Sequence, residues 1–109
     1  MAESFRQIWA KKERTVPATS ALVVDSIPLA DFRRLEYIIE IREIGGAKSV
    51  SFKFAVMNVE TDVNHQVFAK HGDSLDYEIS PKVNGSECEI EIVNNETTNL
   101  GATLVRSKL

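Results

Sequence analysis

The fold is decided by one stretch of sequence, Arg34-Leu35-Glu36-Tyr37-Ile38-Ile39-Glu40-Ile41-Arg42. Every second residue from Leu35 to Ile41 is apolar, and the residues between them are charged, with Ile38 as the one exception. This period of two predicts a β-strand with one buried and one solvated face. A helix would distribute the same apolar residues around its circumference. We therefore expect this stretch to be the central strand of an antiparallel all-β core.

The same alternation recurs along the chain, with turn signals between the strands. Gly45-Gly46 predicts one tight connection, and Asn84-Gly85 predicts a type I′ hairpin. About seven to eight strands at this spacing predict a single antiparallel β-sandwich of jelly-roll type. The residues expected in its core are Leu35, Tyr37, Ile39, Ile41, Phe52, Phe54, Ile90 and Ile92.

The ends of several strands are marked by polar residues and proline. We expect a first strand over residues 21–24, broken at Asp25, and a turn or wide loop over the polar residues 57–64. Residues 66–69 predict a short strand. Pro81 is expected to end a later one, because proline cannot donate a ladder hydrogen bond.

Residues 3–14 differ from the rest of the chain. Ser4 and Gln7 form a capping-box pattern. Three large apolar side chains then follow at helical spacing. These are Phe5, Ile8 and Trp9. The pattern predicts a short helix or arm over residues 1–15, ahead of a β-sandwich domain over residues 16–109.

Two interpretations of this N-terminal segment stay open at the level of sequence. A helix this short is marginal in water by itself. It therefore packs on its own domain or anchors the domain to a partner. Large aromatic side chains often dominate interfaces, so we predict that Phe5, Ile8 and Trp9 bind a partner.

Composition restricts the classes of function. The chain has 109 residues, enough for one domain, with 43% hydrophobic and 27% charged residues. A net charge of -3 argues against binding to nucleic acid or an anionic membrane. The sequence has no apolar run long enough to span a bilayer and no signal-peptide core, so we expect folding in the compartment of synthesis.

No residue pattern in the sequence predicts a reaction, a metal site or a cofactor. Cys88 is the single cysteine and is expected in the core. His65 and His71 are too few for a zinc site, which needs three or four converging ligands. The row of alternate glutamates from Glu87 to Glu91 is interpreted as a solvated strand face. Nucleophile elbows and phosphate-binding glycine loops are absent from the sequence, so we expect a protein that is not an enzyme.

From Val16 onward the chain resembles the small β-sandwich modules of tailed-bacteriophage structural proteins. The resemblance is carried by residues 24–26 and 30–38, by residues 76–80 and 89–92, and by the C-terminal residues 104–109. The chain departs from the family pattern in two turns, at residues 57–61 and 83–86. Its last three residues, Ser-Lys-Leu, match a peroxisomal signal, but they also match the usual ending of these modules.

The resemblance implies a non-enzymatic structural component of a virion, made in the host cytoplasm and placed in the tail, fibre, baseplate or capsid decoration. Its partners would be other virion proteins, and its similarity to fibre modules favours a homotrimer. The alternative is a module that binds a glycan or another host-surface ligand, with residues 58–64 as the candidate loop. Such a site usually exposes tryptophan or tyrosine, and both tyrosines are predicted on inward strand faces.

Overall fold

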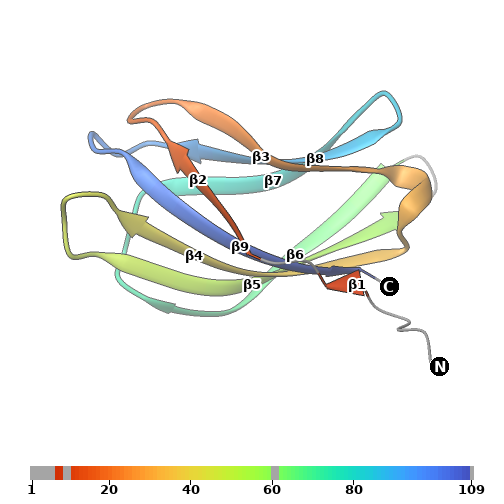
Figure 1. The fold of residues 1–109 in the computed structure, drawn as a ribbon, viewed down its shortest axis with the longest axis horizontal. Helices are drawn as coiled ribbons and strands as arrows, with labels where there is room; N and C mark the ends of the chain where they lie inside the picture. Colours follow the sequence, from red (N-terminus) through yellow and green to blue (C-terminus); the bar gives the residue numbers. More distant parts are fainter. Residues whose placement is uncertain (1–6, 9–10, 60–61, 109) are drawn as a thin grey trace.

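The computed structural model describes residues 7–8, 11–59 and 62–108, and it confirms the predicted antiparallel β-sandwich (Figure 1). Two sheets pack face to face. The larger sheet contains β1 (Gln7–Ile8), β2 (Lys12–Val16), β4 (Arg34–Glu43), β5 (Ser49–Val59), β6 (Asp62–Gly72) and β9 (Leu100–Lys108). The smaller sheet contains β3 (Ala21–Pro28), β7 (Tyr77–Asn84) and β8 (Glu87–Asn94). A 3-10 turn, η1 (Leu29–Asp31), precedes β4.

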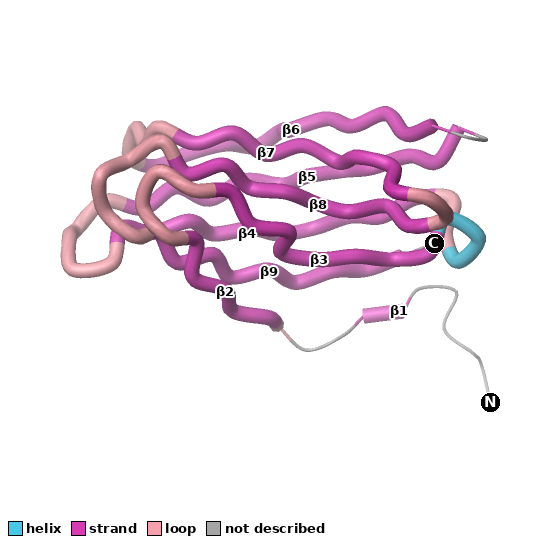
Figure 2. Tube along the Cα trace, turned by 90° about the horizontal axis from the view of Figure 1, so that it is seen from above, coloured by secondary structure: helices cyan, strands magenta, loops and turns pink. Residues whose placement is uncertain are grey.

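Strands near the N-terminal end of the chain pair with strands near its C-terminal end. The larger sheet has the order β1-β9-β4-β5-β6, with β2 also paired to β9, and the smaller sheet has the order β3-β8-β7. The pairs β2–β9 and β3–β8 join early strands to late strands of the chain, one pair in each sheet. The strands β4, β5 and β6 instead form a meander, which leaves β6 at one margin of the molecule (Figure 2).

The core is the one that the alternating sequence predicts. All eight predicted core residues are buried, with exposed fractions of 0–1%. In the β4–β5 ladder, Tyr37 lies opposite Phe54 and Ile39 lies opposite Phe52. The rings of Tyr37 and Phe54 have centroids 6.1 Å apart. Cys88 is also fully buried, as predicted.

The prediction that the first strand ends at Asp25 was wrong. β3 continues to Pro28. Its pairing with β8 shifts register between Val23 and Asp25, as in a β-bulge. The extra residue allows two consecutive side chains, Val24 and Asp25, to face the interior. A bulge can redirect a side chain in this way without ending the strand.

The expected loop over residues 57–64 was wrong, and the strand expected over residues 66–69 is present as part of a longer one. β5 and β6 are both eleven residues long, and their pairing runs from Val59 opposite Asp62 to Val50 opposite Gly72. Polar residues are accepted here because β6 is an edge strand whose side chains are largely exposed. Pro81 lies inside β7, likewise an edge strand, where a missing N–H group need not break a ladder.

The predicted N-terminal helix is not present in the described residues. Gln7–Ile8 and Lys12–Val16 are strands paired with β9. The edge of β9 offers a ladder of hydrogen bonds, whereas an isolated short helix gains little. The β-branched residues Thr15 and Val16 also favour a strand.

The β7–β8 hairpin forms where Asn84-Gly85 predicts it, with a different turn. Asn84 pairs with Glu87, so Gly85 and Ser86 are the two connecting residues. Gly85 has a φ of 64°, and Ser86 is outside the set of residues with positive φ. A type I′ turn needs positive φ at both positions, so this turn fits type II′.

Candidate interaction surface

The three predicted partner-binding residues fall mostly beyond the described structure. Phe5 and Trp9 lie outside the described residues. For Ile8, the structure describes the backbone, which belongs to β1 and pairs with Ser107 near the end of β9. Their binding to a partner therefore stays a prediction.

A buried carboxylate, that of Asp25, links the two sheets of the sandwich. Asp25 Oδ2 accepts hydrogen bonds from the hydroxyl of Tyr37 at 2.7 Å and from Arg106 Nη1 at 3.0 Å. Asp25 Oδ1 accepts a third from Lys12 Nζ at 3.1 Å. The carboxylate itself is inaccessible, whereas the Lys12 side chain is 38% exposed. These four residues, the Asp25 cluster, connect β2, β4 and β9 of the larger sheet to β3 of the smaller one.

The Asp25 cluster stabilises the fold, and the pKa values of the buried groups argue against a catalytic role. Burial and the neighbouring Asp25 carboxylate raise the pKa of Tyr37 far above its usual value, so its hydroxyl stays protonated and donates to Asp25. Burial also raises the pKa of Cys88 to about 11, with smaller contributions from Asp25 and Glu89. A thiol with so high a pKa is a poor nucleophile at neutral pH.

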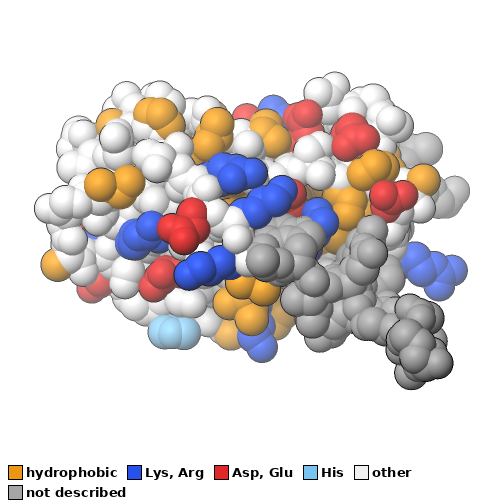
Figure 3. Space-filling view, viewed as in Figure 1, with side chains coloured by type: hydrophobic (Ala, Val, Ile, Leu, Met, Phe, Trp, Pro, Cys, Tyr) orange, Lys and Arg blue, Asp and Glu red, His pale blue; other side chains and the backbone are white. Residues whose placement is uncertain are grey.

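The outer face of the larger sheet carries an exposed apolar group. Ile38 is 55% exposed, the largest exposure among the large hydrophobic side chains of the described residues. It lies between Val105 on β9 and Lys53 on β5, and Phe68 on β6 lies opposite Lys53. In Figures 1 and 3 the larger sheet lies below the smaller one, and Figure 3 shows apolar side chains on the lower side of the molecule, with lysine and arginine side chains nearby. We call the row of Val105, Ile38, Lys53 and Phe68 the outer row.

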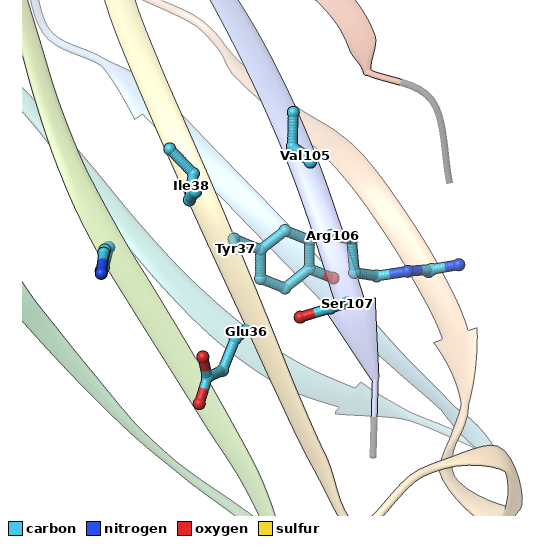
Figure 4. A pocket seen from close by; sticks show the side chains of 7 residues that line it. Glu36, Tyr37, Ile38, Val105, Arg106 and Ser107 are labelled. Carbon is cyan, nitrogen blue, oxygen red and sulfur yellow. The ribbon is translucent and has the colours of Figure 1, made fainter. Parts of the chain in front are cut away.

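A shallow hollow of about 200 Å³ is formed around Ile38 and Val105. In Figure 4 these two side chains lie on neighbouring strands, Glu36 and Ser107 lie one step along, and Arg106 extends away from them. A similar hollow of about 190 Å³ lies next to it, around Met57 and Gln66. Arg34 Nε donates to Glu36 at 2.8 Å. The face therefore combines exposed apolar groups with a charged surround, a composition found in interfaces.

The signal for this face was present in the sequence. Ile38 is the one apolar residue on the solvated side of the central strand, and that exception marks the middle of the outer row. Phe68 gave no such signal, because its strand was predicted over residues 66–69 alone. Pairing with β5 is what places it on this face.

The predicted acidic face is found on the smaller sheet. Glu87, Glu89 and Glu91 lie on the outward side of β8 and are half-buried. They accept hydrogen bonds from Ser26, Asn84 and Lys82 respectively, at 3.0–3.1 Å. Among the described residues, no three His, Cys, Asp or Glu side chains come close enough together to hold a metal ion. That part of the chain also contains no helix of the length and hydrophobicity needed to cross a membrane.

Solved structures with a similar fold include phage tailspike proteins. The tailspike of Acinetobacter baumannii phage AM24 gives a TM-score of 0.55 at 6% identity over 94% of this chain. The tailspike of Acinetobacter phage vB_ApiP_P1 gives 0.50 at 11% identity over 90% of it. A third tailspike, from A. baumannii bacteriophage Fri1, is described as a capsular polysaccharide depolymerase and gives 0.45 at 9% identity, again over 90% of this chain.

The chain thus has the fold of a β module found within phage tailspikes, as its resemblance to phage structural modules predicted. It spans 26%, 22% and 17% of the three tailspike chains. No protein-family model matches the sequence, and no curated protein matches it. At identities of 6–11%, the likeness concerns the fold.

Proposed function

We propose that the chain is a structural module of a phage tail that acts through protein–protein contacts and not by catalysis. The single observation that carries this proposal is its fold, which matches a β module of the AM24 tailspike over 94% of the chain. The outer row, in which Ile38 is exposed and Val105 and Phe68 are half-buried, adds support, because apolar groups with a charged surround are typical of protein interfaces. Within the virion, its partners would be other tail proteins.

The titratable groups also favour a structural role. Tyr37 and Cys88 are the strongly perturbed groups in the described residues, and both have raised pKa values and lie in the core. Catalytic acids and bases instead have pKa values near the working pH and lie within reach of a substrate. We therefore propose that any enzymatic activity of the complete particle belongs to other parts of the tail.

The proposal is tested by quantitative mass spectrometry of purified particles from the phage that encodes the chain. A structural module should be present in a fixed number of copies per particle and should stay bound through a density gradient. Tail-specific antibodies provide the location by electron microscopy. Absence from particles that contain the other tail proteins would rule the proposal out.

A second candidate function is binding of a host-surface glycan. It is favoured by the hollow around Ile38, where Glu36, Lys53 and Ser107 provide polar groups beside an apolar floor. The earlier candidate, a loop over residues 58–64, is replaced because most of these residues belong to β5 and β6.

A glycan array separates the two functions. Reproducible binding that is lost in Glu36→Ala and Lys53→Ala variants, and kept in Glu89→Ala on the opposite sheet, would support the glycan function. An array without reproducible signals would leave protein–protein assembly as the function of this face. The three variants change exposed or half-buried side chains, so each should fold normally.

A further inference from the structure

The Asn84-Gly85 pair that marks the β7–β8 hairpin also has a chemistry of its own. In such a pair, the backbone nitrogen of the second residue can attack the side-chain amide of the first. Glycine favours this reaction because it has no Cβ atom to shield the nitrogen. Of the six asparagines in the sequence, Asn84 alone is followed by glycine. The structure of the hairpin then decides whether the folded chain leaves the pair free to react.

Both residues are accessible at the tip of the hairpin. Asn84, Gly85 and Ser86 are all exposed, and the connection between β7 and β8 projects at the upper right of Figure 1. A Cβ atom placed on Gly85 would have no atom within 4 Å apart from those of the adjacent residues. Water therefore reaches the turn around both the attacking nitrogen and the amide.

The hairpin leaves the nitrogen of Gly85 outside the strand ladder. Asn84 pairs with Glu87, and a two-residue turn is closed by the backbone groups of the residues that flank it. Gly85 lies between these two residues, so its N–H group has no ladder partner to lose. Asn84 is the last residue of β7, and a rotation that brings its side-chain carbon to the Gly85 nitrogen disturbs the terminal pair of the ladder.

The side chain of Asn84 is held far less firmly than that of Asn94. Asn84 Nδ2 donates to Glu89 Oε2 at 3.1 Å, and a hydrogen bond between exposed groups contributes little because water competes for both. Asn94 is fully buried, and its Nδ2 donates to three backbone oxygens at 2.9–3.1 Å. Its Oδ1 accepts from the backbone nitrogen of Glu96 at 2.8 Å. The fold therefore immobilises one asparagine amide and leaves the other free to turn.

We propose that Asn84 is a site of spontaneous conversion to aspartate and isoaspartate, which charges and loosens the tip of the β7–β8 hairpin. The Gly85 nitrogen gives up its proton and bonds to Cγ of Asn84. The bond between Cγ and Nδ2 breaks, and Nδ2 leaves with that proton as ammonia. Water opens the resulting five-membered imide ring at Cγ, which gives aspartate, or at the backbone carbonyl carbon, which gives isoaspartate. The reaction needs no co-reactant besides water.

The new carboxylate is unfavourable where it forms. Glu87 lies directly opposite Asn84, and Glu89 loses the amide that donates to it. Like charges directly opposite each other destabilise a pair of strands. Because a neutral amide becomes a carboxylate, the net charge of the chain changes from -3 to -4.

The isoaspartate product also lengthens the main chain by one carbon atom between Asn84 and Gly85. The turn then loses the spacing that its contact with the rest of the molecule requires. The backbone oxygen of Ser86 accepts the N–H group of Leu29 at 2.8 Å, and Leu29 begins η1 ahead of β4. Conversion therefore weakens both the end of the hairpin and its attachment to η1.

Peptide mapping by mass spectrometry tests the site, after the folded full chain has been incubated in water enriched in heavy oxygen. Cleavage after glutamate gives a peptide of residues 79–87, in which Asn84 is the single asparagine. A second peptide, residues 92–96, contains Asn94 and Asn95. The first should gain the mass of a carboxyl group that carries one heavy oxygen, and the second should stay unchanged. On isoelectric focusing, the intact chain should shift by one negative charge.

Asn84→Gln is the matched control. Its longer side chain must close a six-membered ring, which forms far more slowly, so the variant should show no acidic shift over the same time. Wild-type chain unfolded in guanidinium serves as the reference for a backbone without the restraints of the hairpin. Far-UV circular dichroism checks that wild type and variant are folded before and after incubation.

Ion-exchange chromatography then separates converted from unconverted chains of one preparation. The converted chains should have the lower melting temperature, because the hairpin end has lost a hydrogen bond and gained a repulsion. Equal melting temperatures would overturn the loosening of the hairpin.

Four results would overturn the site itself. The first is a folded chain that stays unconverted while the unfolded chain reacts, since the hairpin would then protect Asn84. The others are no conversion in either state, conversion of residues 92–96 as fast as that of residues 79–87, and an acidic shift in Asn84→Gln equal to that of the wild type. The inference is independent of the proposed function, because each result is read from the isolated chain.

Discussion

The two faces of β4 differ in the exposure of their apolar side chains. On the inner face, Leu35, Tyr37, Ile39 and Ile41 are buried to 0–1% exposure. On the outer face, Ile38 is 55% exposed between charged neighbours. The inner face determines the fold. The outer face does not determine the fold, and the proposed function assigns its exposed apolar residue to contacts with a partner.

The largest effect on stability is expected from truncating a residue of the buried layer, and a truncation on the outer face serves as its control. Phe52→Ala should lower the free energy of unfolding by about 3–5 kcal/mol, because it leaves a cavity opposite Ile39 in a fully buried layer. Ile38→Ala, the matched control on the outer face, should change it by less than about 0.5 kcal/mol. Urea denaturation of both variants provides the comparison. Equal losses would mean that the outer row is part of the core.

The second prediction concerns the charged part of the interior. Asp25→Ala removes the acceptor for Tyr37, Lys12 and Arg106 and should cost about 3 kcal/mol, the lower end for a broken buried pair because Lys12 is partly exposed. Ser26→Ala, at the next position and exposed, should be nearly neutral. Thermal denaturation measures both. A stable Asp25→Ala variant would show that the cluster contributes nothing net to the fold.

Much of this architecture could be predicted from sequence because alternation is a local signal. β4, β5 and β8 each carry it, and all eight predicted core residues are buried. The errors occur where pairing partners decide the structure. Lys12–Val16 is a charged sequence that becomes a strand because β9 offers its edge, and β6 is long because β5 is long.

The candidate surface was harder to predict for the same reason. Ile38 was visible as an exception in one strand, but the outer row needs residues from four strands brought into register. Asp25 was taken as the end of a strand, since a single sequence does not show that a bulge directs its carboxylate inward.

A smaller effect is expected at alkaline pH from the buried thiol. The pKa of Cys88 is about 11 in the folded protein, above the value of an exposed thiol. The folded state therefore holds its proton more tightly, and stability that is complete below about pH 8.5 is lost as the pH rises toward 11. Between pH 8 and 10.5, the wild type should lose about 2 kcal/mol more than Cys88→Ala, measured by urea denaturation. Parallel curves would contradict the raised pKa.

The smallest effect on folding is expected from removing the N-terminal segment. In the described residues, the part before Lys11 contributes two paired positions, Gln7 with Lys108 and Ile8 with Ser107. Deleting residues 1–10 should therefore change the free energy of unfolding by less than about 1 kcal/mol. Deleting residues 1–14 also removes Lys12 from the Asp25 cluster and most of β2, so it should destabilise the sandwich more.

The same deletion tests whether the N-terminal segment attaches the module to a partner. If Phe5, Ile8 and Trp9 attach the module to a neighbouring virion protein, the variant lacking residues 1–10 should lose that partner in co-purification. Retention of the partner would instead assign attachment to the outer row, where Ile38→Asp should then abolish it.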